Sequence, residues 1–284
     1  MVTRFTTRLF CAIALAGLFF CLSQAPQAQL PPPTAQDTAS DSAYGSPSPE
    51  WTTGDNGGFG MGPWTLSPAS NTPQSGFFVG SSIGNNGVSG DTNGDGDINT
   101  VPGNRAWGLY ANSGQTASAV RDFNLPFTPG SAFEIFMDTG DVQAGGKVGF
   151  ALQNSAGQDL LEVYFVGGDT QYTVHGNTPI SSGVSFTREG VQVVITLTTA
   201  STYQARLTRL VNGASSTVSG TLRANPGPIS RLSLFFINAG TSPDNDVFFN
   251  RITYYRGRVL NVNTGRGYLD IRPDRKSTRL NSSH

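Results

Sequence analysis

The feature that most constrains this chain is a series of short apolar or alternating runs between residues 51 and 255. In residues 191–198 the apolar side chains fall at every second position, and residues 203–207 repeat the pattern after a Thr-Ala-Ser-Thr segment. A period of two places the apolar side chains on one face of a β-strand, and a short polar turn between two such runs predicts a hairpin. No window has a long helical period, so the sequence predicts an all-β protein.

The apolar runs define a set of expected strands with similar spacing. We predict strands at residues 64–66, 77–80, 105–111, 117–123, 133–138, 147–153, 160–166, 172–175, 184–187, 191–198, 203–210, 217–222, 229–237 and 247–255. Many short strands without helices are typical of an antiparallel two-sheet sandwich or a barrel. We expect one such domain at residues 50–257, a length that suffices for a sizeable core.

The N-terminal residues have the pattern of an export signal. Arg4 and Arg8 precede an apolar run at residues 9–22, and small residues follow. The run is shorter than the roughly 18 apolar residues that a membrane span requires. We therefore interpret residues 1–28 as a signal peptide. The mature chain is expected to be secreted, periplasmic or at the cell surface, without a transmembrane span.

Three further segments flank the expected domain. Residues 29–49 are rich in Pro, Ser, Ala and Gln, which favours an extended linker. Residues 274–284 resemble a widely used short-read sequencing adapter translated in frame, so we interpret them as an artefact. Residues 258–273 are then a truncated continuation of the natural chain.

The composition of the mature chain excludes several kinds of site. Both cysteines, Cys11 and Cys21, lie in the predicted signal peptide, so no disulfide or thiolate metal site is expected. Without residues 1–28 and 274–284, only His175 remains of the histidines, which excludes a zinc site with two or three histidine ligands. Basic residues then fall from 18 to 13 and acidic residues from 19 to 18, so no nucleic-acid partner is expected.

An acidic loop carries the clearest chemical signal. Oxygen-bearing side chains recur at alternate positions, with Gly96 at the turn: Asp91, Asn93, Asp95, Asp97 and Asn99. Ca²⁺ takes six to eight oxygen ligands, and this spacing is similar to the first nine residues of an EF-hand or dockerin loop. Pro102 stands where such a loop has its bidentate acid, and it also prevents a following helix.

The loop is therefore interpreted as an inter-strand site for structural calcium. Three carboxylates this close together repel one another unless a cation neutralises them. The alternative is a solvated turn without an ion, and the sequence leaves both open.

Four segments resemble a known group of proteins: residues 105–112 (RAWGLYAN), 147–154 (KVGFALQN), 161–168 (LEVYFVGG) and 245–250 (NDVFFN). They are similar to secreted bacterial modules of the concanavalin A-like lectin/glucanase type. The resemblance covers about residues 51–256 and implies a jelly-roll sandwich. Such modules are often attached to larger surface proteins or carbohydrate-active enzymes. Because this fold hosts lectins, hydrolases, lyases and structural modules, it leaves the function open.

Catalytic carboxylates are scarce. A glucanase of this type would resemble Glu-x-Asp-x-x-Glu on one strand, and residues 133–138 do not match that pattern. Glu134 and Asp138 share a face, but four residues of strand span about 13 Å. Glycosidase carboxyl pairs lie roughly 5–9.5 Å apart. Glu162 could meet either of them across a sheet, which the sequence does not determine. No catalytic residue is assigned.

Aromatic residues are the candidates for ligand binding, because flat rings match the apolar faces of pyranose sugars. Trp107 and Tyr110 stand on opposite faces of one expected strand, close after the acidic loop. If Trp107 is exposed, ring and ion form one site; the alternative for each ring is the core. Burial of Trp51, Trp64 and Trp107 together would exclude sugar binding by tryptophan stacking.

Three functions remain after these arguments. The first is a non-catalytic binding or surface module that recognises a polysaccharide or cell-surface glycan, with calcium in one loop. The second is a polysaccharide-active enzyme, a glycoside hydrolase or lyase, whose acids come from different strands. The third is a structural or adhesive surface protein.

Overall fold

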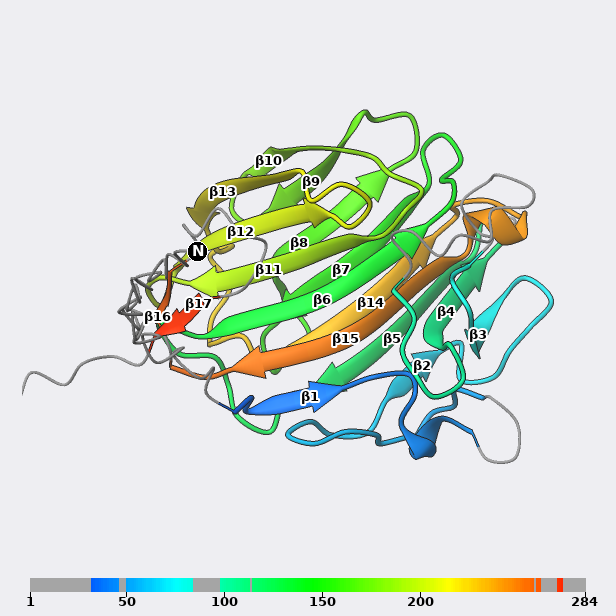
Figure 1. Cartoon of the computed structure of the whole chain (residues 1–284), viewed down its shortest axis with the longest axis horizontal. Coiled ribbons are helices and arrows are strands. Elements are labelled where there is room, and N and C mark those ends of the chain that lie inside the picture. Colours follow the sequence, from blue (N-terminus) through cyan, green and yellow to red (C-terminus); the bar gives the residue numbers. More distant parts are fainter. Residues whose placement is uncertain are drawn as a thin grey trace, which may run out of the picture.

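The computed structural model describes residues 32–45, 50–83, 98–112, 114–257, 259–261 and 270–272. These residues form two antiparallel sheets that pack face to face (Figure 1). Only two single-turn 3-10 helices occur among them, η1 (Ser42–Tyr44) and η2 (Pro243–Asn245). The predicted all-β fold, an antiparallel two-sheet sandwich of jelly-roll type, is confirmed.

The larger sheet has the strand order β13-β12-β11-β6-β15-β4-β3, and β1 pairs with the free part of β15. Its strands are β1 (Ala35–Asp37), β3 (Ser75–Gly80), β4 (Ala106–Ala111), β6 (Ala132–Thr139), β11 (Val191–Leu197), β12 (Thr202–Arg209), β13 (Ser215–Thr221) and β15 (Val247–Tyr255).

The smaller sheet has the strand order β10-β9-β8-β7-β14-β5-β2. Its strands are β2 (Thr65–Ser67), β5 (Thr116–Asp122), β7 (Lys147–Gln153), β8 (Asp159–Val166), β9 (Gln171–His175), β10 (Pro179–Ser185) and β14 (Arg231–Ile237). A separate pair joins β16 (Val259–Asn261) to β17 (Asp270–Arg272).

The alternating runs became strands because each has one apolar face to bury. β11 pairs with β12 in the predicted hairpin, with Ile195 opposite Ala205. Odd-numbered residues of both strands face the core, as the alternation requires. The strand predicted at residues 184–187 lies earlier in the chain, because β10 runs from Pro179 to Ser185.

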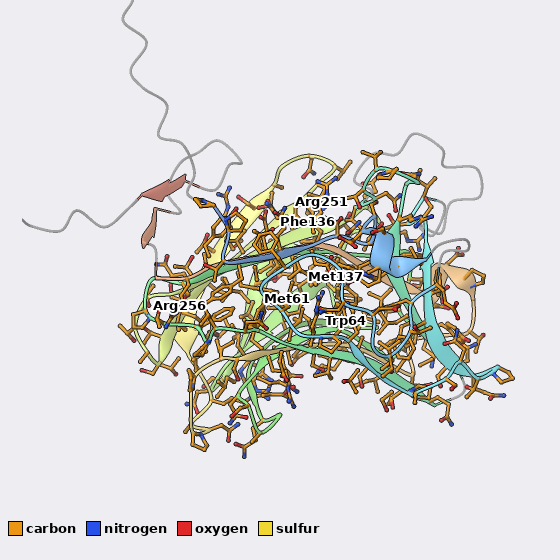
Figure 2. All side chains as sticks on the ribbon, turned by 90° about the horizontal axis from the view of Figure 1, so that it is seen from below. Met61, Trp64, Phe136, Met137, Arg251 and Arg256 are labelled. Atoms are coloured by element: carbon orange, nitrogen blue, oxygen red, sulfur yellow. The ribbon has the colours of Figure 1, made fainter. Side chains whose placement is uncertain are left out.

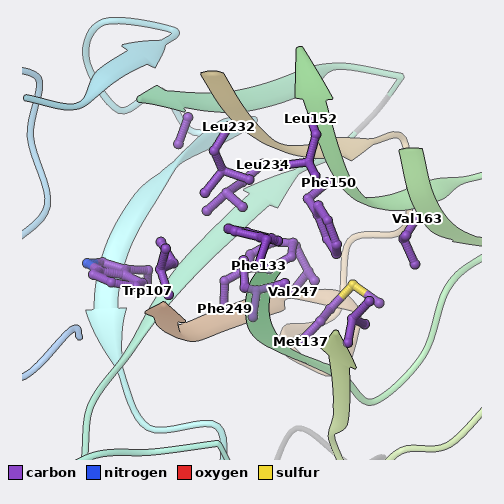
Figure 3. Packing of buried hydrophobic residues seen from close by; sticks show 14 of the residues in the cluster. Trp107, Phe133, Met137, Phe150, Leu152, Val163, Leu232, Leu234, Val247 and Phe249 are labelled. Atoms are coloured by element: carbon purple, nitrogen blue, oxygen red, sulfur yellow. The ribbon is translucent and has the colours of Figure 1, made fainter. Parts of the chain in front are cut away.

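The core fills the space between the two sheets. Figure 3 shows Phe133 of β6 and Phe150 of β7 packed against each other from opposite sheets, with their ring centroids 5.7 Å apart. Trp107 and Phe249 extend this core along the larger sheet, and both are fully buried. Alternate residues of every central strand therefore contribute to a single core, as expected of a sandwich.

The prediction that residues 29–49 form a linker is wrong for the part that the structure describes. β1 hydrogen-bonds along β15, with Gln36 opposite Thr253, and Ala35 is fully buried. Tyr44 is also fully buried, and its ring lies edge-on to Trp107 at 5.2 Å. A segment that appears polar and Pro-rich in the sequence thus supplies an edge strand and a core ring.

A buried ion pair explains why this segment stays in place. Asp37 accepts a hydrogen bond from the Arg121 guanidinium of β5, and both side chains are fully buried. Tyr44 donates its hydroxyl to the same carboxylate, and Arg121 also donates to the Gly57 carbonyl at 2.6 Å. Burial raises the pKa of Asp37 to about 6, while the positive charge of Arg121 opposes that rise.

Several predictions fall outside the described residues. They are the signal peptide, the adapter segment and most of the acidic loop, including Asp91, Asn93, Asp95 and Asp97. Within the described part of the chain, no helix has the length and apolar character of a membrane span.

Candidate functional site

The outer face of the larger sheet is the candidate binding surface. Because Phe133, Ile135 and Met137 of β6 lie in the core, the alternate residues of that strand face outward. Figure 2 shows this arrangement: Phe136 and Arg251 lie on one side of the sheet, and Met137 lies on the other, toward Met61 and Trp64.

Apolar side chains cover part of this outer face. Phe136 is 8% exposed and Phe248 is 4% exposed, although both point away from the core of the sandwich. They form a second cluster with Ile98 and Ala106, against which Phe78 packs. An outward face with buried rings differs from the polar outer face that an antiparallel sheet usually presents to water.

Two aromatic rings at the β3–β4 edge of this face, Phe78 and Tyr110, form what we call the aromatic platform. In the strand register Phe78 lies opposite Gly108, and Tyr110 lies opposite Gly76. A Cβ atom at Gly108 would lie 2.3 Å from the Phe78 ring, and one at Gly76 would lie 2.6 Å from the Tyr110 hydroxyl. The Phe78 ring and the Tyr110 hydroxyl therefore lie over the backbone of the neighbouring strand, where only glycine leaves room.

The platform is fixed in place and half-buried. The two ring centroids are 6.4 Å apart at an interplanar angle of 41°, and Phe248 meets Phe78 edge-on at 5.5 Å. The Tyr110 hydroxyl donates to the Thr72 carbonyl at 2.8 Å. Burial is the larger cause that raises the pKa of Tyr110, and the negative charge of Asp246 raises it further. The tyrosine is therefore a neutral ring at physiological pH.

Beyond the platform, toward β13, the outer face of the larger sheet carries polar side chains. Glu134 accepts a hydrogen bond from the Gln192 amide, and the Arg251 guanidinium lies 5.0 Å from the Phe136 ring centroid. Burial raises the pKa of Glu134, while Gln192 and Arg251 oppose the shift. Further hydrogen-bonding side chains follow on the paired outward positions of β12 and β13: Gln204, Arg206, Thr208, Ser215, Thr217 and Ser219.

Both ends of the acidic loop lie beside the platform. The Ser82 amide donates to the Asn99 side-chain oxygen at 2.9 Å, and Ile98 packs in the same apolar cluster as Phe78. Fully buried Asn250 donates to the carbonyls of Ile98 and Arg105, at 2.9 Å and 2.7 Å. The base of the loop is thus fixed to β15.

Of the five predicted calcium ligands, Asn99 alone is described, and its amide nitrogen donates to the Ser81 hydroxyl. No group of three or more His, Cys, Asp or Glu side chains that could hold a metal ion occurs in the described ranges. The other four predicted ligands lie outside those ranges, so the calcium prediction is untested.

The prediction that Trp107 binds a ligand is wrong. Trp51, Trp64 and Trp107 are 2%, 1% and 0% exposed and pack together in the core. Sugar binding by tryptophan stacking is therefore excluded. Tyr110 stands on the opposite face of β4 and is half-buried, as the alternation between the two residues predicted. The sequence did not show which of the two faced the core.

A charged cluster that the sequence analysis missed lies on the outer face of the smaller sheet. Glu162 pairs with Lys147 at 2.6 Å and with Arg223, and Arg223 also approaches Asp159 at 3.3 Å. His175 lies opposite Glu162 in the strand register. Arg223 follows β13 and reaches the cluster only through the fold, so no local motif could reveal it.

The cluster has the geometry of a structural network rather than of acid–base catalysis. Although burial alone would raise it, the pKa of Glu162 is lowered, because Lys147 and Arg223 hold the charged form. Arg223 donates to Nδ1 of His175 at 3.0 Å, which places the imidazole proton on Nε2. Burial and the positive charge of Arg223 lower the pKa of His175. Neither group is poised to accept a proton.

No protein-family model matches the chain, and no curated protein matches it. Among solved structures, a carbohydrate esterase of the Shiga toxin-encoding bacteriophage phi24B is similar, with 14% identity over 78% of this chain and 97% of that chain and a TM-score of 0.46. An endo-acting O-glycanase structure from human gut microbiota has 10% identity over 68% of this chain and 91% of that chain, with a TM-score of 0.40.

A sialidase is also similar, with 11% identity over 55% of this chain and a TM-score of 0.41. This match spans only 16% of the sialidase. At these identities no residue role transfers from any of the three proteins.

Proposed function

We propose that the domain is an exported, non-catalytic module that binds carbohydrate on the outer face of its larger sheet. The observation that carries the proposal is the aromatic platform: Phe78 and Tyr110 lie over glycines, and both remain partly exposed. Partly exposed aromatic rings on a sheet offer an apolar surface to the C–H groups of a pyranose.

Hydrogen-bonding groups on the same face support a sugar ligand over a purely apolar one. Glu134, Gln192 and Arg251 supply an acceptor, an amide and a guanidinium near the buried Phe136 ring. Ligand sites of this kind combine apolar surface with a few fixed polar groups. The polar rows of β12 and β13 extend the face enough for an oligosaccharide rather than a single sugar.

Calcium is the second part of the proposal. Asp91, Asn93, Asp95, Asp97 and Asn99 would hold the ion in a loop whose base lies beside Phe78. In that position the ion would fix the loop next to the platform and would be structural.

Glycan binding by two tyrosine variants tests the proposal. We expect Tyr110→Ala in residues 32–257 to weaken binding to the glycans that the wild-type protein retains on an array. Loss of one ring contact is worth about 1–1.5 kcal/mol, or roughly five- to tenfold in Kd. Isothermal titration with the best glycan measures the change.

The matched control is Tyr164→Ala. Tyr164 is also half-buried on an outer sheet face, but it belongs to the smaller sheet, where Lys147 lies 4.0 Å from its ring centroid. Equal losses in the two variants, or an array without any retained glycan, would contradict carbohydrate binding at the platform.

Thermal melts test the calcium proposal. At a Ca²⁺ concentration about 100 times Kd, binding adds roughly 2.7 kcal/mol to the free energy of unfolding. For a domain of this size the melting temperature should then rise by about 5–10 °C over a chelated sample. Asp95→Asn should reduce the rise, and Asp169→Asn, at an exposed turn of the smaller sheet, should leave it unchanged. Identical melts with Ca²⁺ and chelator would rule out a structural ion.

The raised pKa of Glu134 favours a second candidate function, a polysaccharide hydrolase or lyase on the same face. Carboxyl groups with raised pKa values occur preferentially at catalytic sites. This function predicts new reducing ends or unsaturated products from a bound polysaccharide, abolished in Glu134→Gln. Binding without turnover favours the non-catalytic module.

A further inference from the structure

A small pocket lies where the edges of the two sheets meet, far from the aromatic platform. Figure 1 shows β10 of the smaller sheet beside β13 of the larger sheet. The pocket has a volume of about 160 Å³. Its lining residues are Gly183, Val184, Ser185, Arg209, Ala214 and Ser215.

The pocket walls are built by two local irregularities of the strands. The pairing of β10 with β9 shifts between Ser181 and Ser185, and Gly183 adopts a φ of +75° within this bulge. A Cβ atom there would lie 2.8 Å from the Ser216 hydroxyl, so the bulge closely approaches β13. Bulges of this kind often redirect side chains next to functional sites.

The opposite wall is the turn that joins β12 to β13. Arg209 both donates its amide to the Ala214 carbonyl and accepts from the Gly213 amide, each at 2.9 Å. These bonds fix the backbone that carries the guanidinium. Ser185, Ala214 and Ser215 are exposed, so the pocket reaches solvent.

Arg209 has unused hydrogen-bonding capacity at this position. Its Nε atom is buried and has no hydrogen-bond partner among the described residues. No carboxylate of those residues forms an ion pair with its guanidinium. Asp138 shares the neighbourhood, since it and Arg209 shift the pKa of Tyr172 in opposite directions. A buried donor without a partner is unfavourable unless a ligand or water supplies an acceptor.

We propose that this pocket binds an oxyanion group, a carboxylate or a sulfate, through the Arg209 guanidinium and the Ser185 hydroxyl. The planar guanidinium fork matches two oxygens of such a group. Each water takes about 30 Å³, so the pocket has room for about five waters, or for one oxyanion and the atoms that carry it. None of its lining residues belongs to the platform, although Ser215 also stands in the polar rows of β12 and β13.

NMR titrations at constant ionic strength test the proposal, with sodium sulfate, sodium glucuronate and glucose as probes. We expect sulfate, glucuronate or both to bind saturably, with shifts at the lining residues, and glucose to cause no shift there. Tighter binding of glucuronate than of sulfate identifies the natural ligand group as the carboxylate of an acidic sugar. Tighter binding of sulfate than of glucuronate identifies it as a sulfate group. Absence of saturable binding by both anions would overturn the proposal.

Two arginine variants assign the binding to the pocket. Arg209→Gln should raise the Kd of the bound anion at least about tenfold, since it removes a charged hydrogen-bond donor. Arg188→Gln removes the same charge from an exposed position between β10 and β11 and should leave the Kd unchanged. Equal affinity of Arg209→Gln and wild type would overturn the proposal.

A third variant keeps the test decisive if Arg209→Gln does not fold. Ser185 is exposed on the edge strand β10, so Ser185→Val should preserve the fold while it narrows the pocket and removes one hydroxyl. We expect it to weaken anion binding with an unchanged melting temperature. Unchanged binding in a folded Ser185→Val protein would contradict the proposed site.

Discussion

At the scale of single residues, Glu134 on the outer face of the larger sheet lies in surroundings that disfavour its charged form. Glu134 sits among Phe136, Val194 and Thr253, with Gln192 as its hydrogen-bond donor. Burial raises its pKa because the charged form loses water, and the Gln192 amide and the Arg251 charge only partly compensate for that loss. The charged form of Glu134 is therefore less favourable in the folded than in the unfolded chain.

This difference predicts a pH dependence of stability. The folded protein binds the Glu134 proton more tightly than the unfolded chain, whose carboxyl has the ordinary pKa of 4.5. The contribution of Glu134 to the free energy of unfolding is fully present below pH 4.5. It is lost as the pH rises through the higher pKa of the folded protein. Glu134→Gln is neutral at every pH, so its free energy of unfolding should increase relative to wild type between pH 4 and pH 8.

Urea unfolding at several pH values measures the effect. Glu189→Gln provides a control for the loss of one carboxylate, because Glu189 lies in the segment between β10 and β11 and not on β6. A constant difference between Glu134→Gln and wild type over this range would show that the Glu134 environment does not favour the neutral form.

At the scale of elements, the N-terminal segment is an integral strand of the sandwich. β1 covers part of β15, and Asp37 neutralises Arg121, whose side chain points into the core from β5. Removing one partner of a buried ion pair leaves an uncompensated charge, which costs about 3–5 kcal/mol.

A shortened protein should expose this dependence. We expect residues 50–257 to melt at least about 10 °C below residues 32–257, since they lack β1, Asp37 and the Tyr44 ring. Arg121→Met should recover part of the loss in the shortened protein by removing the unpaired charge. Coincident melting curves for the two lengths would mean that β1 adds nothing to stability.

The strands with strong alternation could be predicted from local sequence, but β1 could not. The run that became β11 carries four apolar residues on one face, whereas β1 consists of Ala-Gln-Asp beside Pro-rich sequence. β1 is held as a strand by residues far away in the sequence, through its pairing with β15 and the Asp37–Arg121 ion pair. The same limit applies to the site: alternation placed Trp107 and Tyr110 on opposite faces, but only the assembled sheets show which ring is exposed.

At the scale of the whole molecule, the two proposed sites lie on opposite edges of the larger sheet. The platform is on β3 and β4, and the pocket is at the end of β12, four strand positions from β4. With a strand spacing of about 4.8 Å, roughly 19 Å separates these strands. Residues this far apart without shared partners act independently.

Independence is measurable in a double variant. Arg209→Gln should leave glycan affinity unchanged, and Tyr110→Ala should leave anion affinity unchanged. In the double variant the two losses should add within about 0.5 kcal/mol when a ligand that occupies both sites is titrated. A coupling above 1 kcal/mol would instead indicate one continuous site across the sheet.

The position of β15 has a consequence for how a nascent chain folds. β15 is the last strand of the sandwich to leave the ribosome, yet it lies between β6 and β4 and also pairs with β1. Until Val247–Tyr255 emerges, the β3–β4 pair and the β6–β11–β12–β13 sheet each expose an unpaired edge, which invites association with other chains. Such distant pairing also slows folding, so we expect the domain to form only after its synthesis is nearly complete.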